Sequence, residues 1–283
     1  MKTSLLLFAA ALGLVSAAFL TLQRPKAVRL PFLVWRAISR DAHGGQYANI
    51  NDIRTYYETY GSGTPVLVLH GGGFSLEGMG NQIRALAPRY FVIAPDSRGQ
   101  GRSTDSDTPL SYSMMADDML KLLDHLDVKR ADIVGWSDGG IIALDIAVHH
   151  PERVGRIVVI GADYDAAGLV APTIGGAIPP APRTYGYIAP DPKHWPVLYR
   201  KLITMWATQP HYTLDELRRI EAPALIIAGE FDIVKRENTD QLARAIPVSE
   251  EYIIPGGTHG VIWERRDIVN DKILQFLERP LSQ

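Results

Sequence analysis

The sequence of 283 residues contains no cysteine. A chain without cysteine forms no disulfides and offers no thiolate ligands to a metal ion, so packing and hydrogen bonds must hold its fold. This absence agrees equally well with a cytoplasmic and with a periplasmic protein.

Blocks of basic residues, internal repeats and low-complexity tracts are also missing. The formal net charge is −2, and no run of Lys and Arg is interleaved with aromatic residues. Nucleic acid is therefore not an expected partner. With 46% hydrophobic and 21% charged residues, the chain has an ordinary globular composition, and its length suits one large α/β domain or two small ones.

An uncharged, apolar run extends from Leu5 to Leu20, directly after a short segment that contains Lys2. With the small residues at 15–18, this pattern predicts a signal peptide at about residues 1–18. The run is short for a membrane span, so an uncleaved anchor is the alternative. Basic residues within 19–46, the expected linker, oppose simple export. We therefore expect a periplasmic or secreted protein, or one tethered to a membrane.

Short apolar runs alternate with amphipathic stretches through the rest of the chain. Strands are predicted at 47–50, 54–60, 66–69, 91–94, 133–134, 156–160, 224–228 and 250–254. Helices are predicted near 82–86, 113–126, 141–148, 238–246 and 267–277. This alternation predicts an α/β fold with a mostly parallel central sheet flanked by helices. Residues from about 162 to 218 are rich in proline and lack strand patterning, which predicts a short helical cap inserted into a domain at 47–283.

The segment Gly135-Trp-Ser-Asp-Gly139 joins a predicted buried strand to a predicted apolar helix. A serine in a sharp turn between a strand and a helix is typical of the nucleophile elbow, G-x-S-x-G. Glycines are needed on both sides because side chains there would collide where the strand and the helix crowd together. Ser137 is therefore the predicted nucleophile.

A serine hydroxyl needs a neighbouring base and a third group that orients this base. In the strand order expected here, the acid and then the histidine follow the serine along the chain. His259 lies in a glycine-rich loop after the last predicted strand and is the predicted base. Asp232 follows the preceding strand and is the predicted acid, with Glu230 and Asp163 as rivals.

The turn His70-Gly-Gly-Gly73 follows a predicted central strand. A developing oxyanion needs backbone N–H donors that no side chain obstructs. We predict Gly72 as one donor, with Gly73 as its rival, and the N–H of Asp138 as the other. Gly73, Trp136 and Asp138 are also the predicted substrate-binding residues. The Asp138 carboxylate has an alternative role, as a cap of its own helix.

Two further groups have predicted supporting roles. Asp96, Arg98 and Ser103 are expected to fix the loop that contains them through an Asp–Arg pair and turn bonds. Aromatic residues of the cap either roof an apolar pocket or attach the cap to the core. They are Tyr185, Tyr187, Trp195, Tyr199 and Trp206.

Together, the motifs around residues 70–73, 96–103, 135–139, 229–232 and 259 resemble those of the α/β-hydrolase fold superfamily. The Gly-Trp-Ser-Asp-Gly-Gly elbow is most similar to that of small biphenyl-hydrolase-like, or valacyclovir-hydrolase-like, esterases. The resemblance implies a serine hydrolase without a cofactor that cleaves an ester, amide, lactone or carbon–carbon bond. Serine at position 137 argues against a haloalkane dehalogenase, because no alkyl-enzyme ester could form.

We therefore expect a hydrolase that acts on a small-molecule carboxylic ester through an acyl-enzyme, with neither a cofactor nor a metal ion. A carbon–carbon bond hydrolase and an acyltransferase of the same fold are alternatives. A non-catalytic binding protein is the alternative from another functional class, and the presence of every expected catalytic residue argues against it.

Overall fold

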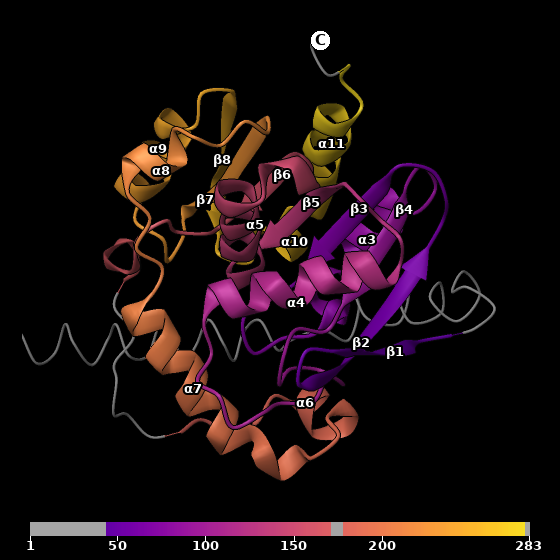
Figure 1. The fold of residues 1–283 in the computed structure, drawn as a ribbon. Helices are drawn as coiled ribbons and strands as arrows, with labels where there is room; N and C mark the ends of the chain where they lie inside the picture. Colours follow the sequence, from indigo (N-terminus) through magenta and orange to yellow (C-terminus); the bar gives the residue numbers. More distant parts are fainter. Residues whose placement is uncertain (1–43, 171–177, 281–283) are drawn as a thin grey trace, which may run out of the picture.

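The computed structural model describes residues 44–170 and 178–280. The predicted signal peptide or anchor, and all but the last residues of the predicted linker, lie outside the described residues. Figure 1 shows a central sheet with helices on both faces and a helical segment at one end. The predicted fold class is confirmed.

Eight strands form one sheet in the order β1-β2-β4-β3-β5-β6-β7-β8. β2 pairs antiparallel with β1 and β4, and all other neighbours are parallel. The strands are β1 Gln46–Ile50, β2 Ile53–Tyr60, β3 Pro65–Leu69, β4 Phe91–Pro95, β5 Ala131–Trp136, β6 Val154–Ile160, β7 Ala224–Phe231 and β8 Ser249–Thr258. Because the strands from β3 to β8 are parallel, the loops after their carboxyl ends meet at one edge of the sheet.

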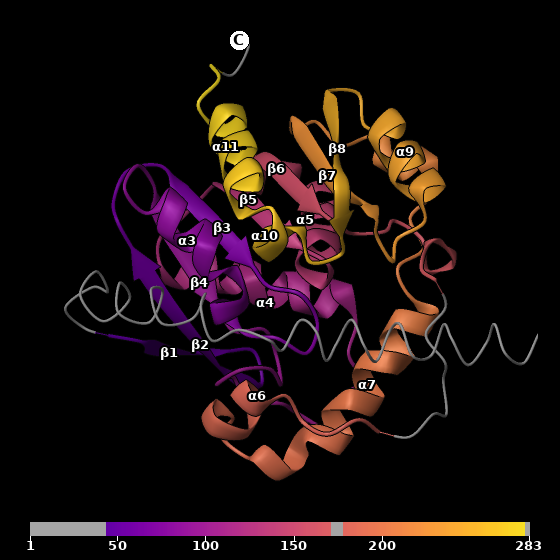
Figure 2. The same cartoon turned by 180° about the vertical axis from the view of Figure 1, so that it is seen from behind.

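Helices cover both faces of the sheet, as the two opposite views show (Figures 1 and 2). One face packs against α4 Tyr112–His125, α5 Asp138–His149 and α9 Arg236–Ala245, and the other against α3 Gly80–Leu86, α10 Val261–Glu264 and α11 Arg266–Leu277. Within β3, Leu67 and Leu69 face the first group, whereas Val66 and Val68 face the second. A strand buried on both faces needs apolar residues at every position, which explains the continuous apolar runs in the sequence.

The chain between β6 and β7 contains helices α6 Arg183–Ile188, α7 Trp195–Thr208 and α8 Leu214–Leu217. This is the segment where the sequence predicts a helical cap. α7 is attached to the loop after β4, because Nζ of Lys201 donates to Oδ2 of Asp105 at 2.9 Å. Nε2 of His194 lies 2.7 Å from the same oxygen.

Two strands, β7 and β8, extend three and four residues past their predicted carboxyl ends. β7 continues to Phe231 and β8 to Thr258, and these two residues pair with each other after an irregularity in the ladder. Glu230 and Phe231 are exposed, so the extension buries too little apolar surface to appear as a hydrophobic run. Among helices of the described residues, none is both long and apolar enough to span a bilayer.

Candidate active site

Ser137 lies in the turn between β5 and α5 with φ of 55° and ψ of −122°. A non-glycine residue with positive φ is strained, and here the crossing of strand and helix maintains the strain. A Cβ atom at Gly135 would lie 2.1 Å from the carbonyl oxygen of Gly139. Glycine at this position therefore allows the close approach of α5 to β5, as the sequence predicts.

His259 and Asp232 come from the loops after β8 and β7. Nε2 of His259 lies 3.1 Å from Oγ of Ser137, and Nδ1 lies 2.7 Å from Oδ1 of Asp232. The carboxylate also accepts the backbone N–H of Val234 at 3.1 Å, which fixes its orientation. An imidazole that donates through Nδ1 presents the lone pair of Nε2 to the serine. The structure thus brings the three predicted residues together in the order that proton transfer requires.

The pKa values of His259 and Asp232 depend on burial and on the charges of neighbouring residues. Burial of His259 favours its neutral form, but the charge and hydrogen bond of Asp232, together with the charges of Asp138 and Asp163, outweigh burial and raise the pKa of His259. Burial alone would raise the pKa of Asp232, yet His259 and backbone N–H donors lower it. Asp232 is therefore ionised at neutral pH and stabilises the imidazolium that forms when His259 takes a proton.

Neither rival carboxylate is hydrogen-bonded to His259. Glu230 is exposed, and its Oε2 accepts the backbone N–H of Gly256 at 2.8 Å. Asp163 is buried, and its Oδ2 has no hydrogen-bond partner among the described residues. Burial raises the pKa of Asp163 to about 7, with a further contribution from the charge of Asp138.

The structure distinguishes between the two predicted glycine donors. The N–H of Gly73 donates to Oε1 of Gln100 at 2.6 Å and is therefore occupied. The N–H of Gly72 has no acceptor in the described part of the chain. Asp138 is the first residue of α5, where a backbone N–H has no partner within the helix. The free donors beside Ser137 are therefore those of Gly72 and Asp138.

His70 fixes the direction of the Gly72 N–H. Its Nδ1 lies 2.8 Å from the carbonyl oxygen of Gly71, and its Nε2 accepts the N–H of Ser97 at 2.9 Å. Nδ1 therefore carries the proton, and burial lowers the pKa of His70 to about 4, which keeps the ring neutral. The C=O of Gly71 and the N–H of Gly72 share one trans peptide and point in opposite directions. Holding this carbonyl orients the N–H on the other side.

The Asp138 side chain does not cap its own helix, which makes that alternative wrong. Nε1 of Trp206, from α7, donates to Oδ1 of Asp138 at 2.9 Å, and the hydroxyl of Tyr112, from α4, donates to the same oxygen at 3.1 Å. A Cβ atom at Gly72 would lie 2.3 Å from Oδ2 of Asp138, so the carboxylate adjoins the glycine turn. Burial raises the pKa of Asp138 to about 6, although both donors lower it.

Trp136 supports the site instead of binding substrate as predicted. Its indole is 1% exposed, and Nε1 donates to the carbonyl oxygen of His259 at 2.9 Å. The ring also packs against Phe74 and Trp263. Trp136 therefore holds the backbone that carries the imidazole.

Of the cap aromatics, Trp206 contacts the core beside Ser137, and the others do not divide cleanly between the two predicted roles. Trp206 contacts Asp138 and lies against the glycine turn, since a Cβ atom at Gly72 would be 2.6 Å from its ring. Tyr185 and Tyr199 pack against Trp195 within the cap. Tyr187 is 86% exposed and contributes to neither role.

The loop after β4 is held by different pairs from the one predicted. Arg98 forms a two-pronged ion pair with Asp118 on α4, at 2.8 and 2.9 Å. Asp96 instead pairs with Arg102 at 3.1 Å. Ser103 donates to the carbonyl oxygen of Asp96 at 2.6 Å, so the predicted turn bond is present.

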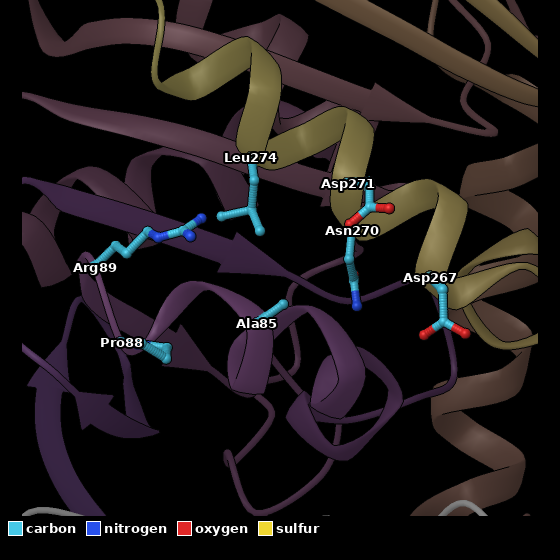
Figure 3. Close-up of a pocket in the computed structure, with 7 residues that line it drawn as sticks. All are labelled: Ala85, Pro88, Arg89, Asp267, Asn270, Asp271 and Leu274. Carbon is cyan, nitrogen blue, oxygen red and sulfur yellow. The ribbon is translucent and has the colours of Figure 1, made fainter.

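A separate surface pocket lies between α3 and α11 (Figure 3). Its polar lining includes Arg89, Asp267, Asn270 and Asp271, and none of the residues around Ser137 contributes to it. Nε2 of Gln82 donates to Oδ1 of Asn270 at 3.0 Å, which holds the two helices together beside it. Within residues 44–170 and 178–280, no group of three or more His, Asp or Glu side chains could hold a metal ion.

Three residues that hold the site were missed or left unassigned from the sequence. Tyr112, His70 and Gln100 each contact a residue far away in the chain, respectively Asp138, Ser97 and Gly73. Only His70 had a local signal, because it begins the glycine turn.

A family model described as alpha/beta hydrolase fold matches residues 64–181. Serine hydrolase BPHL of Homo sapiens is 28% identical over 248 residues, which cover 81% of this chain and 84% of that protein. The 2-hydroxymuconate semialdehyde hydrolase of Pseudomonas sp. (strain CF600) is 33% identical over 181 residues, 62% of this chain and 59% of that protein. A relative from Azorhizobium caulinodans is 39% identical over 124 residues, and the match spans about half of it, 47%.

Solved structures agree with these matches. The structure of a serine hydrolase involved in carbazole degradation, the CarC enzyme, has a TM-score of 0.69 at 26% identity, and the match covers 82% of this chain and 98% of that one. The predicted resemblance is therefore confirmed: the chain has the α/β-hydrolase fold, and the family model, the relatives and the solved structure that match it are α/β-hydrolases.

Proposed function

We propose that the chain is a cofactor-independent serine hydrolase that cleaves small-molecule carboxylic esters through an acyl-enzyme. The observation that carries the proposal is the continuous series of contacts from Ser137 Oγ through the His259 imidazole to the Asp232 carboxylate. Such a series activates a serine hydroxyl at neutral pH on unrelated folds.

Acylation begins when Nε2 of His259 takes the proton of the Ser137 hydroxyl while Oγ attacks the ester carbonyl. The carbonyl oxygen becomes an oxyanion, which accepts hydrogen bonds from the N–H groups of Gly72 and Asp138. Collapse of this intermediate breaks the bond to the alcohol oxygen, which receives the proton from His259. The alcohol leaves, and the acyl group remains on Ser137.

Deacylation repeats these steps with water. His259 takes a proton from water, whose oxygen attacks the acyl carbonyl, and the same two N–H groups stabilise the second oxyanion. His259 then returns the proton to Oγ as the carboxylic acid leaves. Asp232 stays ionised throughout and stabilises the imidazolium of both steps.

The first test is loss of function at Ser137 and His259. We expect Ser137→Ala and His259→Ala to lower hydrolysis of a short-chain p-nitrophenyl ester by at least about 10³-fold. Ser137→Ala should also lose covalent labelling by a fluorophosphonate probe. Ser113→Ala, on the exposed side of α4, is the matched control and should keep both properties. More than about a tenth of wild-type activity in pure, folded Ser137→Ala protein would contradict the mechanism.

A second candidate reaction is hydrolysis of a carbon–carbon bond. The similarity to 2-hydroxymuconate semialdehyde hydrolase favours it. Turnover of a 2-hydroxymuconate semialdehyde with kcat/KM above that for every simple ester tested would assign this reaction instead. Under either reaction, Ser137→Ala separates a catalytic protein from a binding protein.

A further inference from the structure

Gln100 lies in the loop after β4, yet its side chain reaches the glycine turn beside Ser137. The residue is 1% exposed, and its Oε1 accepts the N–H of Gly73 at 2.6 Å. At the other end of the turn, His70 bridges Gly71 and Ser97. The loop after β4 therefore holds the glycine turn at both ends, at one through the imidazole of His70 and at the other through the side-chain amide of Gln100.

The orientation of the Gln100 amide follows from its partner. Gly73 offers a donor, so the amide oxygen must face it, because a flipped amide would set two donors against each other. Nε2 then points away, and it is buried without an acceptor among the described residues. An unsatisfied buried donor lowers stability. Such an arrangement is typical of groups kept for function at the expense of stability.

The backbone that carries Gln100 is fixed on both sides. Its N–H donates to the carbonyl oxygen of Ser97 at 2.9 Å, and its own carbonyl oxygen accepts the N–H of Ser103 at 3.0 Å. Asp96 accepts the N–H of Arg102 at 2.9 Å, which closes the loop. The side chain therefore extends from a rigid base toward Gly73, which suits it for holding a second peptide in place.

Without this hydrogen bond, the peptide between Gly72 and Gly73 would lose a constraint. Gly73 has φ of 75°, and two adjacent glycines have wide conformational freedom. Rotation of that peptide would free the N–H of Gly73. It would also change the conformation at Gly72, whose N–H is a proposed oxyanion donor. An oxyanion donor is effective only while it is held in place before the reaction.

We propose that Gln100 is a positioning residue of the oxyanion hole. By accepting the N–H of Gly73, it keeps that group out of the hole and holds the Gly72 N–H in its direction toward the substrate oxygen. This inference rests on the proposed serine-hydrolase function. The loop after β4 would then act in the reaction through Gln100, whereas its ion pairs only hold the loop in place.

The test uses two substitutions in the full-length protein. Gln100→Met keeps the length of the side chain but removes the acceptor, and Gln100→Asn keeps an amide that is too short to reach Gly73. We expect kcat for a p-nitrophenyl ester to fall about 10- to 100-fold in both, with KM changed by less than about threefold. The loss should be smaller than the roughly 10²–10³-fold loss of a whole donor, because Gly72 is misaligned and not removed.

Two readouts distinguish positioning from damage to the fold. Fluorophosphonate labelling should reach the same final stoichiometry as in wild type but at a lower rate, because the phosphonyl oxygen uses the same hole. The acid limb of the pH profile should not move, since Gln100 does not contact His259. Gln46→Met is the matched control: Oε1 of Gln46 accepts one hydrogen bond, from Tyr57 at 2.9 Å, on the edge strand β1. Its kcat should equal that of wild type.

Unchanged kcat in both Gln100 variants would overturn the inference, as would a loss of labelling stoichiometry equal to the loss of kcat. Failure of the proposed function gives a different result, because wild-type protein would then hydrolyse no ester and would not be labelled at Ser137.

Discussion

At the scale of single residues, three buried carboxylates surround the imidazole of His259, and only one binds it. Asp232 lies 2.7 Å from Nδ1, whereas Asp138 and Asp163 influence the ring through their charge. A carboxylate bound to Nδ1 fixes the tautomer, which charge at a distance does not. Geometry therefore favours Asp232 for the proposed role of orienting acid.

The Asp232 assignment predicts a ranking of three substitutions. Asp232→Asn should lower kcat by about 10³- to 10⁴-fold, because an amide in this place favours the wrong tautomer of His259. Asp163→Asn and Glu230→Gln should each change kcat less than about tenfold. Steady-state kinetics on a p-nitrophenyl ester gives the ranking, with circular dichroism to verify the fold. If Asp163→Asn proved the inactive variant, the acid would be misassigned.

The raised pKa of His259 predicts the pH dependence of the reaction. Only the neutral imidazole accepts the proton of Ser137, so activity is present above the pKa of His259 and is lost as the pH falls through it. Since Asp232 raises this pKa above the ordinary histidine value of about 6.5, the acid limb of kcat/KM should lie above pH 6.5.

Removal of the neighbouring charge of Asp163 tests the same dependence of the acid limb on the pKa of His259. Asp163 also contributes to the raised pKa of His259, so Asp163→Asn should move the acid limb to lower pH while most of the maximal rate remains. An acid limb below pH 6.5 in wild type, or one that moves upward in this variant, would show that another group controls the reaction.

At the scale of elements, three helices meet at the Asp138 carboxylate. Asp138 begins α5, Tyr112 begins α4, and Trp206 lies near the end of α7. The hydrogen bond from Trp206 connects the cap to α5, and the one from Tyr112 connects α4 to it. The buried acid that accepts both lies beside the glycine turn. A carboxylate in this position attracts a positively charged group on the substrate.

We therefore expect esters of α-amino acids to be favoured over their deaminated analogues by about tenfold or more in kcat/KM. In Asp138→Asn the preference should fall to near unity. Because the pKa of Asp138 is about 6, the preference should be present above this pH and decline as the pH falls through it. Equal substrate ratios in the two proteins would mean that the carboxylate serves only to attach α7 through Trp206.

The sequence predicts those elements whose signal is local. Continuous apolar runs predict the central strands because both faces of the sheet are covered, and the glycines around Ser137 predict the elbow because strand and helix crowd there. The choice between Gly72 and Gly73 is not local, since it depends on the hydrogen bond that the Gly73 N–H donates to Gln100. The partners of Asp138 come from α4 and α7, and no spacing in the chain relates those helices to the elbow.

At the scale of the whole molecule, the loops after four parallel strands meet at one edge of the sheet. The glycine turn follows β3, Ser137 follows β5, Asp232 follows β7 and His259 follows β8. β6 lies between β5 and β7 in the sheet. Residues more than a hundred positions apart in the chain, such as Ser137 and His259, are therefore brought into contact because parallel strands end at the same edge.

The proposed location of the protein in the cell rests on a different part of the chain. We propose that residues 1–18 are a signal peptide, or else a retained membrane tether, because the run Leu5–Leu20 carries no charge. Its 16 residues are fewer than the roughly 20 that a spanning helix needs, which favours cleavage. The basic residues that follow resist translocation and favour retention.

These opposing terms lead to distinct results for full-length protein carrying a C-terminal tag. Cleavage would give a soluble, exported product whose intact mass lacks the first 17 or 18 residues. Retention would give the full mass in the membrane fraction, released by detergent but not by high salt. Leu12→Arg interrupts the apolar run and should prevent both outcomes, leaving full-length protein in the cytoplasm. If the unmodified chain behaved like Leu12→Arg, the apolar run would have neither proposed role.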